Sequence, residues 1–562
     1  MHPPSDQPQT GSQPRTSQRG FWLDRLGVVV SPGWIGGVFG IAILLPTCVV
    51  AVAMVSGVAE HGAGDAALST SRWGSLARTL AYASGIGLLS TLLALPAAAL
   101  VARLRPGWLV ALATPMLLPS FLTYAGWSIA RAPTTLVGRW IAGAPERGLE
   151  WLPLVVSRGL AVWGLSLWAW PLAGVVIVLG FRATASQLDD ALRLDCVRAS
   201  QRWRARLASV WPSVLTAWGL VTLLMLGSAV PLHVARVQTF AIRVWTTLDT
   251  HPGEPWRAWL AAWPLALIAA IAGWVISGRF ARAGRRMAAL AEPTEEAAHS
   301  GSRPGVVLRV AAALPWVLAV VVPLGLFWST MGSPRMLGVF LERAGEGVAT
   351  SLVVGAAVGA IASLTCLAVA HAASDAGSNG LRGFVLRALL AACLAWALLP
   401  GVLVGAAIAS MMRLPMVPDA IGESAIPMVV AHVSRVLFLP VLIGLWLASS
   451  EARSIGESRR LDGATGPIAW GRTALGSVLG PSLAVGLASL CLSVHEIESS
   501  LQVQSPGIDH LAQRLLQWLH YERTAELSAA GVLLLGLGVV GSVLAILLTR
   551  RPGLRTRTGR WR

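Results

Sequence analysis

The sequence predicts an all-α protein that crosses a membrane many times. Hydrophobic residues make up 55 % of the 562 residues, the mean hydropathy is +0.65, and charged residues make up only 13 %. Soluble globular domains carry about a quarter charged residues, and disordered chains combine low hydrophobicity with high charge. A soluble fold of this length cannot bury so much apolar surface, whereas a polytopic membrane protein exposes it to lipid.

Twelve apolar segments are long enough to cross a bilayer. The hydrocarbon core is about 30 Å thick and needs roughly 20 helical residues at about 1.5 Å per residue. Gly, Ala, Ser and Pro are frequent in these segments, which suits close packing between membrane helices. The expected spans are 34–57, 76–102, 108–130, 153–180, 208–230, 259–278, 309–331, 348–372, 384–411, 426–448, 479–494 and 529–548.

The distribution of arginine predicts the orientation. With the N-terminus inside, the two tails and the inside loops hold 29 of the 44 Arg residues and 12 acids, while the outside segments hold 15 of each. Excess positive charge marks the cytoplasmic side. We therefore expect both termini in the cytoplasm, with a disordered tail at 1–33 and a basic tail at 549–562. Topology explains the formal net charge of +17, so no nucleic-acid partner is expected.

All basic residues other than histidine are arginine, and the chain has no lysine. A P-loop needs a lysine to reach nucleotide phosphates, and a Schiff-base enzyme needs a lysine amine, so neither site can exist in this chain. The five cysteines show no CxxC spacing, and the four that lie in apolar runs are expected to act as small buried apolar residues. His495, Glu496 and Glu498 lack a converging ligand set, so no metal site and no cofactor bound by this chain are expected.

Short motifs recur in the same order in two halves of the chain. The charged stretch 279–308 is expected to be a cytoplasmic linker between a first half, 34–278, and a second half, 309–548. Each half has six expected spans, so the repeat is parallel, with a pseudo-twofold axis along the membrane normal. The matching pairs, at offsets of 267 to 281 residues, are Leu117-Leu118-Pro119 with Leu398-Leu399-Pro400, Leu80 with Leu352, Gly87 with Gly359, Pro171 with Pro440, and Arg193-Leu194-Asp195 with Arg460-Leu461-Asp462.

The last of these matches lies in two long cytoplasmic loops, 182–207 and 449–479. In the second loop, the run from Glu457 to Gly463 predicts a short helix that ends at the glycine, which tolerates the left-handed conformation. Two such elements on the membrane surface are suited to docking a partner. A chain without a P-loop that pumps a solute must receive its energy through such a contact.

The two loops resemble the EAA loop of inner-membrane permease subunits of ABC importers, whose pattern is Glu-Ala-Ala, three variable residues and Gly. In the second loop, Glu457 and Gly463 stand at the Glu and Gly positions, Ser458-Arg459 replace the two alanines, and Ala464 follows. The first loop has Asp190-Ala191-Leu192 in place of Glu-Ala-Ala and Cys196 in place of the glycine. The resemblance implies that these residues couple the chain to an ATPase.

The second half also ends like the fused, two-domain permeases of the ferric-iron and thiamine type. The similar runs are 492–498, 505–507 and 516–521. The resemblance implies a type I permease fold with twelve spans in the cell inner membrane. It also implies two copies of a cytoplasmic ATPase that bind ATP and Mg²⁺, and an extracytoplasmic binding protein that delivers the solute. In this interpretation the chain is a transport subunit and not itself an enzyme.

Arg435 and Glu496 are candidates for the transport pathway, because ionisable groups in apolar spans are costly and are usually functional. Alternatively, arginines near span ends extend to the interface. Two other classes stay open. An ion-coupled secondary transporter would also use two six-span halves, and an integral membrane enzyme would need clustered catalytic side chains. The solute itself is not predicted: ferric iron, thiamine and phosphonates all remain possible.

Overall fold

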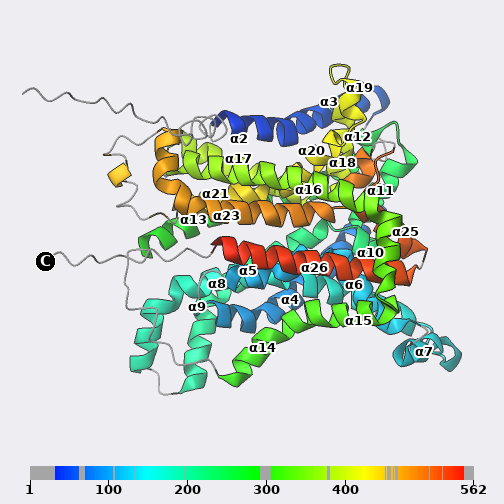
Figure 1. The fold of residues 1–562 in the computed structure, drawn as a ribbon, viewed down its shortest axis with the longest axis horizontal. Coiled ribbons are helices and arrows are strands. Elements are labelled where there is room, and N and C mark those ends of the chain that lie inside the picture. Colours follow the sequence, from blue (N-terminus) through cyan, green and yellow to red (C-terminus); the bar gives the residue numbers. More distant parts are fainter. Residues whose placement is uncertain are drawn as a thin grey trace, which may run out of the picture.

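The fold is entirely helical over the part of the chain that the structure, a computed structural model, describes (Figure 1). Among the described residues, ten helices are long and apolar enough to cross a membrane, or eleven if one bent pair counts as a single span. The chain is therefore a multi-span membrane protein. The described residues are 32–62, 70–104, 108–132, 135–195, 198–290, 305–375, 380–449, 451, 457–459, 461, 466–504, 507–521 and 523–549.

The first half contains six long helical segments with short helices between them. Its first span is the run α2 (Pro32–Phe39), η1 (Gly40–Leu44) and α3 (Leu45–His61). The other long segments are α4 (Thr70–Val101), the broken run α5 (Trp108–Ala113), η2 (Thr114–Leu117) and α6 (Ser120–Ser128), α8 (Leu152–Asp195), α9 (Ala199–Leu226) and α13 (Trp263–Leu290). The short helices are η3 (Ile129–Arg131), α7 (Leu136–Ala142), η4 (Pro145–Arg147), α10 (Val230–Val234), α11 (Phe240–Thr250) and α12 (Pro255–Ala261).

The second half follows with a similar succession. Its first span is the run α14 (Val306–Trp316), η6 (Val317–Val321) and α15 (Val322–Met331). The next helices are α16 (Arg335–Asp375), α17 (Leu381–Leu398), α18 (Gly401–Met412), α19 (Asp419–Gly422), α20 (Ile426–Val436) and α21 (Phe438–Ser449). The last are α23 (Pro467–Val494), α24 (Ser500–Val503), α25 (Leu511–His520) and α26 (Thr524–Thr549).

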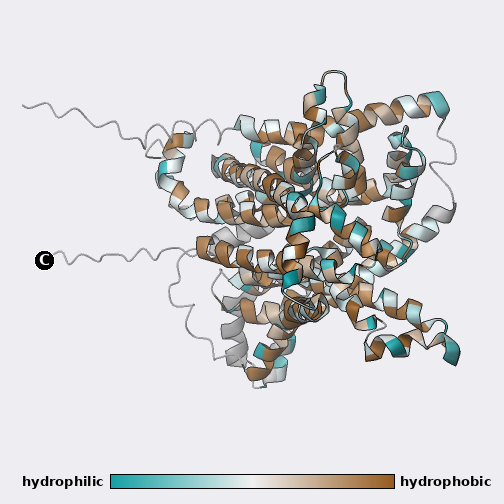
Figure 2. Cartoon of the chain, turned by 45° about the vertical axis from the view of Figure 1, so that its right-hand side comes forward, coloured by the Kyte–Doolittle hydropathy of each residue, from teal (hydrophilic) through white to brown (hydrophobic). Residues whose placement is uncertain are grey.

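The long helices run side by side, and α2 begins at the end of the bundle where α26 finishes (Figure 1). In the first half α4, α8 and α9 pack against one another, and in the second half α16, α21 and α23 do so. Apolar residues line the long helices along their length (Figure 2). Val52, Val55 and Val353 are each about 70 % exposed, which suits a lipid-facing surface and would be costly in water.

The first span of each half carries a π-helical turn just before a proline. The turn η1 precedes Pro46 at the start of α3, and the turn η6 precedes Pro323 at the start of α15. Proline lacks an N–H, so it cannot donate the usual bond to the preceding helical turn. Prolines and π turns are the usual sites of irregularity in long helices. The two spans therefore depart from regular α geometry in the same way.

The expectations of continuous spans over 108–130 and over 384–411 are wrong, because the helix breaks at a Leu-Pro step in each. Leu118 (φ −92°, ψ 148°) and Pro119 are extended between η2 and α6. Leu399 (φ −71°, ψ 153°) and Pro400 break the chain between α17 and α18 in the same conformation. Proline disfavours the α region for the residue before it, which explains both breaks. Segment 426–448 is also interrupted: α20 and α21 meet at 46°.

Three predicted connections contain more helix than expected. Helix α23 begins at Pro467, inside the predicted loop 449–479. Helix α13 continues through the first part of the predicted linker 279–308, as far as Leu290. Helix α8 extends beyond the membrane-spanning part, which ends at Arg182, to Asp195. Most of the predicted tails, 1–33 and 549–562, lies outside the described residues.

Candidate functional site

Arg435 and Glu496, the two candidate pathway residues, lie together inside the bundle. Arg435 is on α20, and Glu496 follows the end of α23. Arg435 Nε lies 3.7 Å from Glu496 Oε1, and the two side chains are 17 % and 19 % exposed. The Glu496 carboxylate also accepts hydrogen bonds from the backbone and side chain of Ser499. This shielded ion pair is the centre of the candidate site.

The guanidinium of Arg435 also binds the backbone where α17 ends. Its NH1 group donates to the carbonyls of Ala397 (2.9 Å) and Leu399 (2.6 Å). The break at Leu399-Pro400 leaves the last carbonyls of α17 without helical partners, so they need another donor. The first half meets the same need with a neutral group, because Trp168 Nε1 on α8 donates to the Leu118 carbonyl at 2.7 Å.

A second carboxylate, Glu498, joins the two halves of the chain. Its Oε1 accepts hydrogen bonds from the amides of Ala229 (2.7 Å) and Val230 (3.3 Å) at the start of α10. Its Oε2 accepts one from the amide of Gly401 (3.0 Å) at the start of α18. The first amides of a helix lack partners within the helix and favour an anion. Sequence alone does not single out Glu498 here, because its partners are backbone groups distant in the chain.

Three histidines extend this polar cluster. The ring nitrogens of His432 lie 2.7 Å from the hydroxyls of Ser493 and Ser500, and the side chain is fully buried. The ring of His510 packs edge-on against it, with centroids 5.5 Å apart. His495, the third histidine, directly precedes Glu496 in the chain. No group of these side chains, or of others within the described ranges, is arranged to hold a metal ion.

Each half uses a buried hydroxyl to bind the first amide of a short helix. Thr79 Oγ1 on α4 accepts a hydrogen bond of 2.8 Å from the Phe240 amide, where α11 begins. Ser351 Oγ on α16 accepts one of 2.9 Å from the Leu511 amide, where α25 begins. Thr79 and Ser351 are 272 residues apart, and the two helix starts are 271 apart. The two contacts are alike in geometry and in position along their halves.

Each half also brings two helices together at a glycine. A Cβ on Gly87 of α4 would stand 2.9 Å from the Trp218 carbonyl of α9. A Cβ on Gly359 of α16 would stand 2.7 Å from the Gly486 carbonyl of α23. Only glycine permits such an approach without displacing the backbone. Gly87 and Gly359 are residues that the sequence matches between the halves, and each lies at a close helix–helix approach.

The extension of α8 and the start of α23, which belong to the two loops predicted to couple to an ATPase, lie at the end of the bundle where α2 begins and α26 finishes (Figure 1). Asp190 and Ala191 are on the extension of α8. Glu457 is exposed in a helical turn, Glu457–Arg459, next to the ion pair between Arg459 and Glu451. Cys196, Gly463 and Ala464 lie outside the described residues, so the predicted helix end at Gly463 stays a prediction.

The chain was also compared with family models, with curated proteins and with solved structures, and none of these matches it. The resemblance to importer permeases therefore rests on the loop motifs and the end of the second half. Within its described residues the chain is nevertheless an all-helical membrane protein with ten or eleven candidate spans.

Proposed function

We propose that the chain is the transmembrane pathway subunit of an ATP-driven importer in the inner (plasma) membrane. Its termini lie in the cytoplasm, and it moves a small solute that an extracytoplasmic binding protein delivers. ATP and Mg²⁺ bind to two copies of a separate cytoplasmic ATPase. The observation that carries the proposal most is that the described parts of the two polar loops, the extension of α8 and the start of α23, lie at one end of a bundle whose halves make similar contacts (Figure 1).

Four features that occur once in each half support a parallel repeat of two permease halves. Two are contacts: the hydroxyl contacts at α11 and α25 and the close helix approaches at glycine. Two are backbone irregularities: the broken Leu-Pro steps and the π turns before proline. The offsets between equivalent residues stay between 267 and 281. Apolar sequences can match by chance, but matched side-chain contacts to backbone amides are far less expected. Repeats of this kind frame a central pathway in transporters.

When the two halves are aligned by these offsets, the carboxylates of the polar cluster have no counterparts in the first half. The offset that relates Trp218 to Gly486 pairs Glu496 with Ser228 and Glu498 with Val230. Small and apolar residues thus stand in the first half where carboxylates stand in the second. The proposed pathway is therefore chemically asymmetric inside a nearly symmetric frame, with Arg435 and Glu496 on one side of it.

Energy enters the chain through its two cytoplasmic loops. When the ATPases close on ATP, the extension of α8 and the turn at Glu457 move together, and the two halves rotate about the pathway. A driver shifts such an equilibrium only if it binds one state more tightly than the other. The bonds of Glu498 to both halves stabilise the state described here, and the other state requires their rearrangement.

Loop variants test the proposal directly. Glu457→Ala, Gly463→Pro and Asp190→Ala are expected to abolish solute-stimulated ATP hydrolysis by the purified complex while the chain still assembles. Glu146→Ala is the control, because Glu146 is exposed on η4, outside both loops. Wild-type stimulation in all three loop variants would refute the coupling role.

One observation favours an ion-coupled secondary transporter as the second candidate. Glu496 and Glu498 share one buried cluster with His432 and His510, and such groups often relay protons in membrane transporters. This candidate predicts uptake by the chain alone in liposomes with a proton gradient and no nucleotide. The importer proposal predicts no uptake under those conditions.

A further inference from the structure

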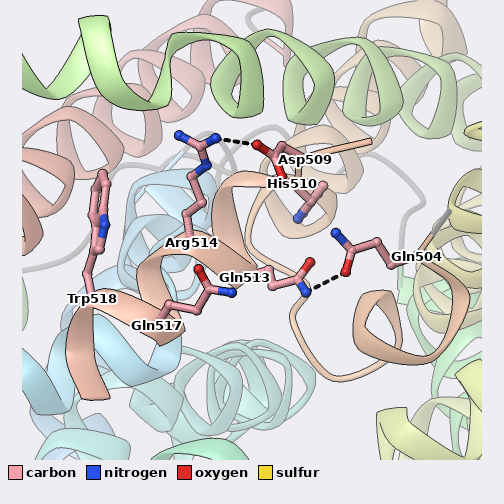
Figure 3. Close-up of a pocket in the computed structure, with 7 residues that line it drawn as sticks. All are labelled: Gln504, Asp509, His510, Gln513, Arg514, Gln517 and Trp518. Carbon is pink, nitrogen blue, oxygen red and sulfur yellow. Dashed lines mark hydrogen bonds and ion pairs between the residues drawn. The ribbon is translucent and has the colours of Figure 1, made fainter. Parts of the chain in front are cut away.

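A polar cavity of about 270 Å³ lies beside α25. Its volume is just below the range of about 300–1,000 Å³ that is typical of small-ligand sites, so it suits a small solute. Gln504 and Gln517 are exposed, whereas His510 and Trp518 are buried, so the cavity has an open side and a closed floor. The lining residues, drawn in Figure 3, are Gln504, Asp509, His510, Gln513, Arg514, Gln517 and Trp518.

Two lining groups have unused hydrogen-bonding capacity. His510 is 1 % exposed, and neither of its ring nitrogens has a hydrogen-bond partner among the described residues. The same holds for Oε1 of Gln513, whose amide nitrogen donates to Gln504. Figure 3 shows the ring of His510 between the Asp509–Arg514 pair and the two glutamine amides. Buried polar groups without partners are costly, so this arrangement indicates a ligand.

The charges of the lining balance each other. The guanidinium of Arg514 pairs with the carboxylate of Asp509 inside the lining. A free anion would face Asp509, and a free cation would face Arg514. The other polar groups are amides and an imidazole, which offer both donors and acceptors. A hydroxyl group both donates and accepts, so it matches this lining better than an ion does.

Trp518 gives the cavity one apolar wall. Its indole is 8 % exposed and is fixed edge-on against Phe340, with centroids 5.6 Å apart. An aromatic wall beside amides suits a molecule that carries C–H groups on one face and hydroxyls on its edges. The floor of the cavity continues into the pathway cluster, because His510 packs against His432.

We propose that this cavity binds the solute before it enters the pathway, and that the solute is an uncharged molecule rich in hydroxyl groups, such as a polyol or a small sugar. His510 and Gln513 bind its hydroxyls, and Gln504 and Gln517 close the open side. The role as an entry site rests on the transport function proposed above. The binding itself does not, because it requires no ATPase and no nucleotide.

The test measures binding by the full chain in lipid nanodiscs, without ATP or partner subunits. The probes are mannitol and maltose, with inorganic phosphate, glutamate and arginine as charged probes. We expect millimolar or tighter binding of at least one uncharged probe. Gln513→Leu and Gln517→Leu are expected to weaken it about tenfold each, the effect of one lost hydrogen bond to a buried partner. Gln238→Leu, an exposed glutamine of the first half, is expected to leave it unchanged.

His510→Phe provides a second variant that keeps the ring and its packing against His432 while it removes both nitrogens. It is expected to weaken binding without a change in the elution profile of the protein. No binding of either uncharged probe would overturn the proposal. So would binding that the three cavity variants leave unchanged, or preferential binding of a charged probe. Failure of the loop variants to uncouple ATP hydrolysis would refute the importer function and leave this binding result intact.

Discussion

Glu498 accepts a hydrogen bond of 3.0 Å from the backbone amide of Gly401. Its other carboxylate oxygen binds Ala229 at 2.7 Å, so one side chain connects the second half to the first. Both amides belong to the starts of short helices that follow interrupted or finished spans. The contact between the halves therefore depends on backbone groups that the irregular helix ends leave available.

Removal of this carboxylate is expected to destabilise the chain. Glu498→Ala leaves the amides of Ala229, Val230 and Gly401 without their acceptor, and each buried donor left unsatisfied costs about 1–3 kcal/mol. The thermal midpoint of the detergent-purified protein is expected to fall by several degrees. Glu146→Ala, an exposed acid, is the control. Equal midpoints for the two variants would contradict the bridging role of Glu498.

The paired hydroxyl contacts predict equal local effects in the two halves. Thr79→Val is expected to speed hydrogen exchange at the start of α11, and Ser351→Ala at the start of α25, because each removes the acceptor of the first amide. The loss is about 1 kcal/mol, as for a helix N-cap. Thr250→Val, at the far end of α11, is the control, since its hydroxyl binds only within its own segment. Faster exchange in one half alone would argue against equivalent roles.

The glycine approaches predict a steep dependence on residue size. Gly87→Val and Gly359→Val place side-chain atoms against the carbonyls of neighbouring helices, with an expected cost of about 1–3 kcal/mol from overpacking. Gly85→Val and Gly345→Val are matched controls on the same two helices, because no atom lies within 4 Å of a Cβ at either position. Thermal midpoints compare the variants. If the controls are destabilised as much as the test variants, helix propensity and not packing is responsible.

The two Leu-Pro breaks differ in the donor that binds their carbonyl. Arg435→Gln removes a charged donor from Leu399, and Trp168→Phe removes a neutral one from Leu118. Hydrogen bonds to charged groups contribute about 1.5–3 kcal/mol, and neutral ones about 0.5–1.5 kcal/mol. The arginine variant is expected to lower the thermal midpoint more than the tryptophan variant. Trp211→Phe, on the exposed face of α9, controls for the change in size. A larger decrease in the thermal midpoint for the tryptophan variant than for the arginine variant would contradict this difference between the two donors.

Much of the fold can be predicted from hydropathy, and the exceptions have identifiable causes. All but two of the expected spans coincide with long helices or with the bent pair α20–α21. The exceptions, 108–130 and 384–411, are interrupted because proline restricts the backbone of the residue before it, and hydropathy does not detect this restriction. The extension of α8 to Asp195 is missed for a similar reason, since a polar helix carries no membrane signal.

The candidate site is less predictable than the fold. Arg435 and Glu496 can be selected because ionisable groups are rare in apolar surroundings. Their contact cannot be foreseen, since it depends on where α20 bends and where α23 ends. The role of Glu498 depends on three backbone amides that become available only after the helices break. Because Glu498 binds backbone amides, the sequence contains no oppositely charged partner residue that would indicate its role.

The central claim is that this chain is a transmembrane subunit that has no ATPase site of its own and is driven by two separate ATPase subunits. Native mass spectrometry of the complex, purified from its own membranes in a mild detergent, tests it most directly. The account predicts one 58.9 kDa chain with two copies of a nucleotide-hydrolysing subunit, and ATP hydrolysis that Glu457→Ala uncouples from the solute. A chain that carries no such subunit, and that takes up solute alone in liposomes on an ion gradient, would contradict it.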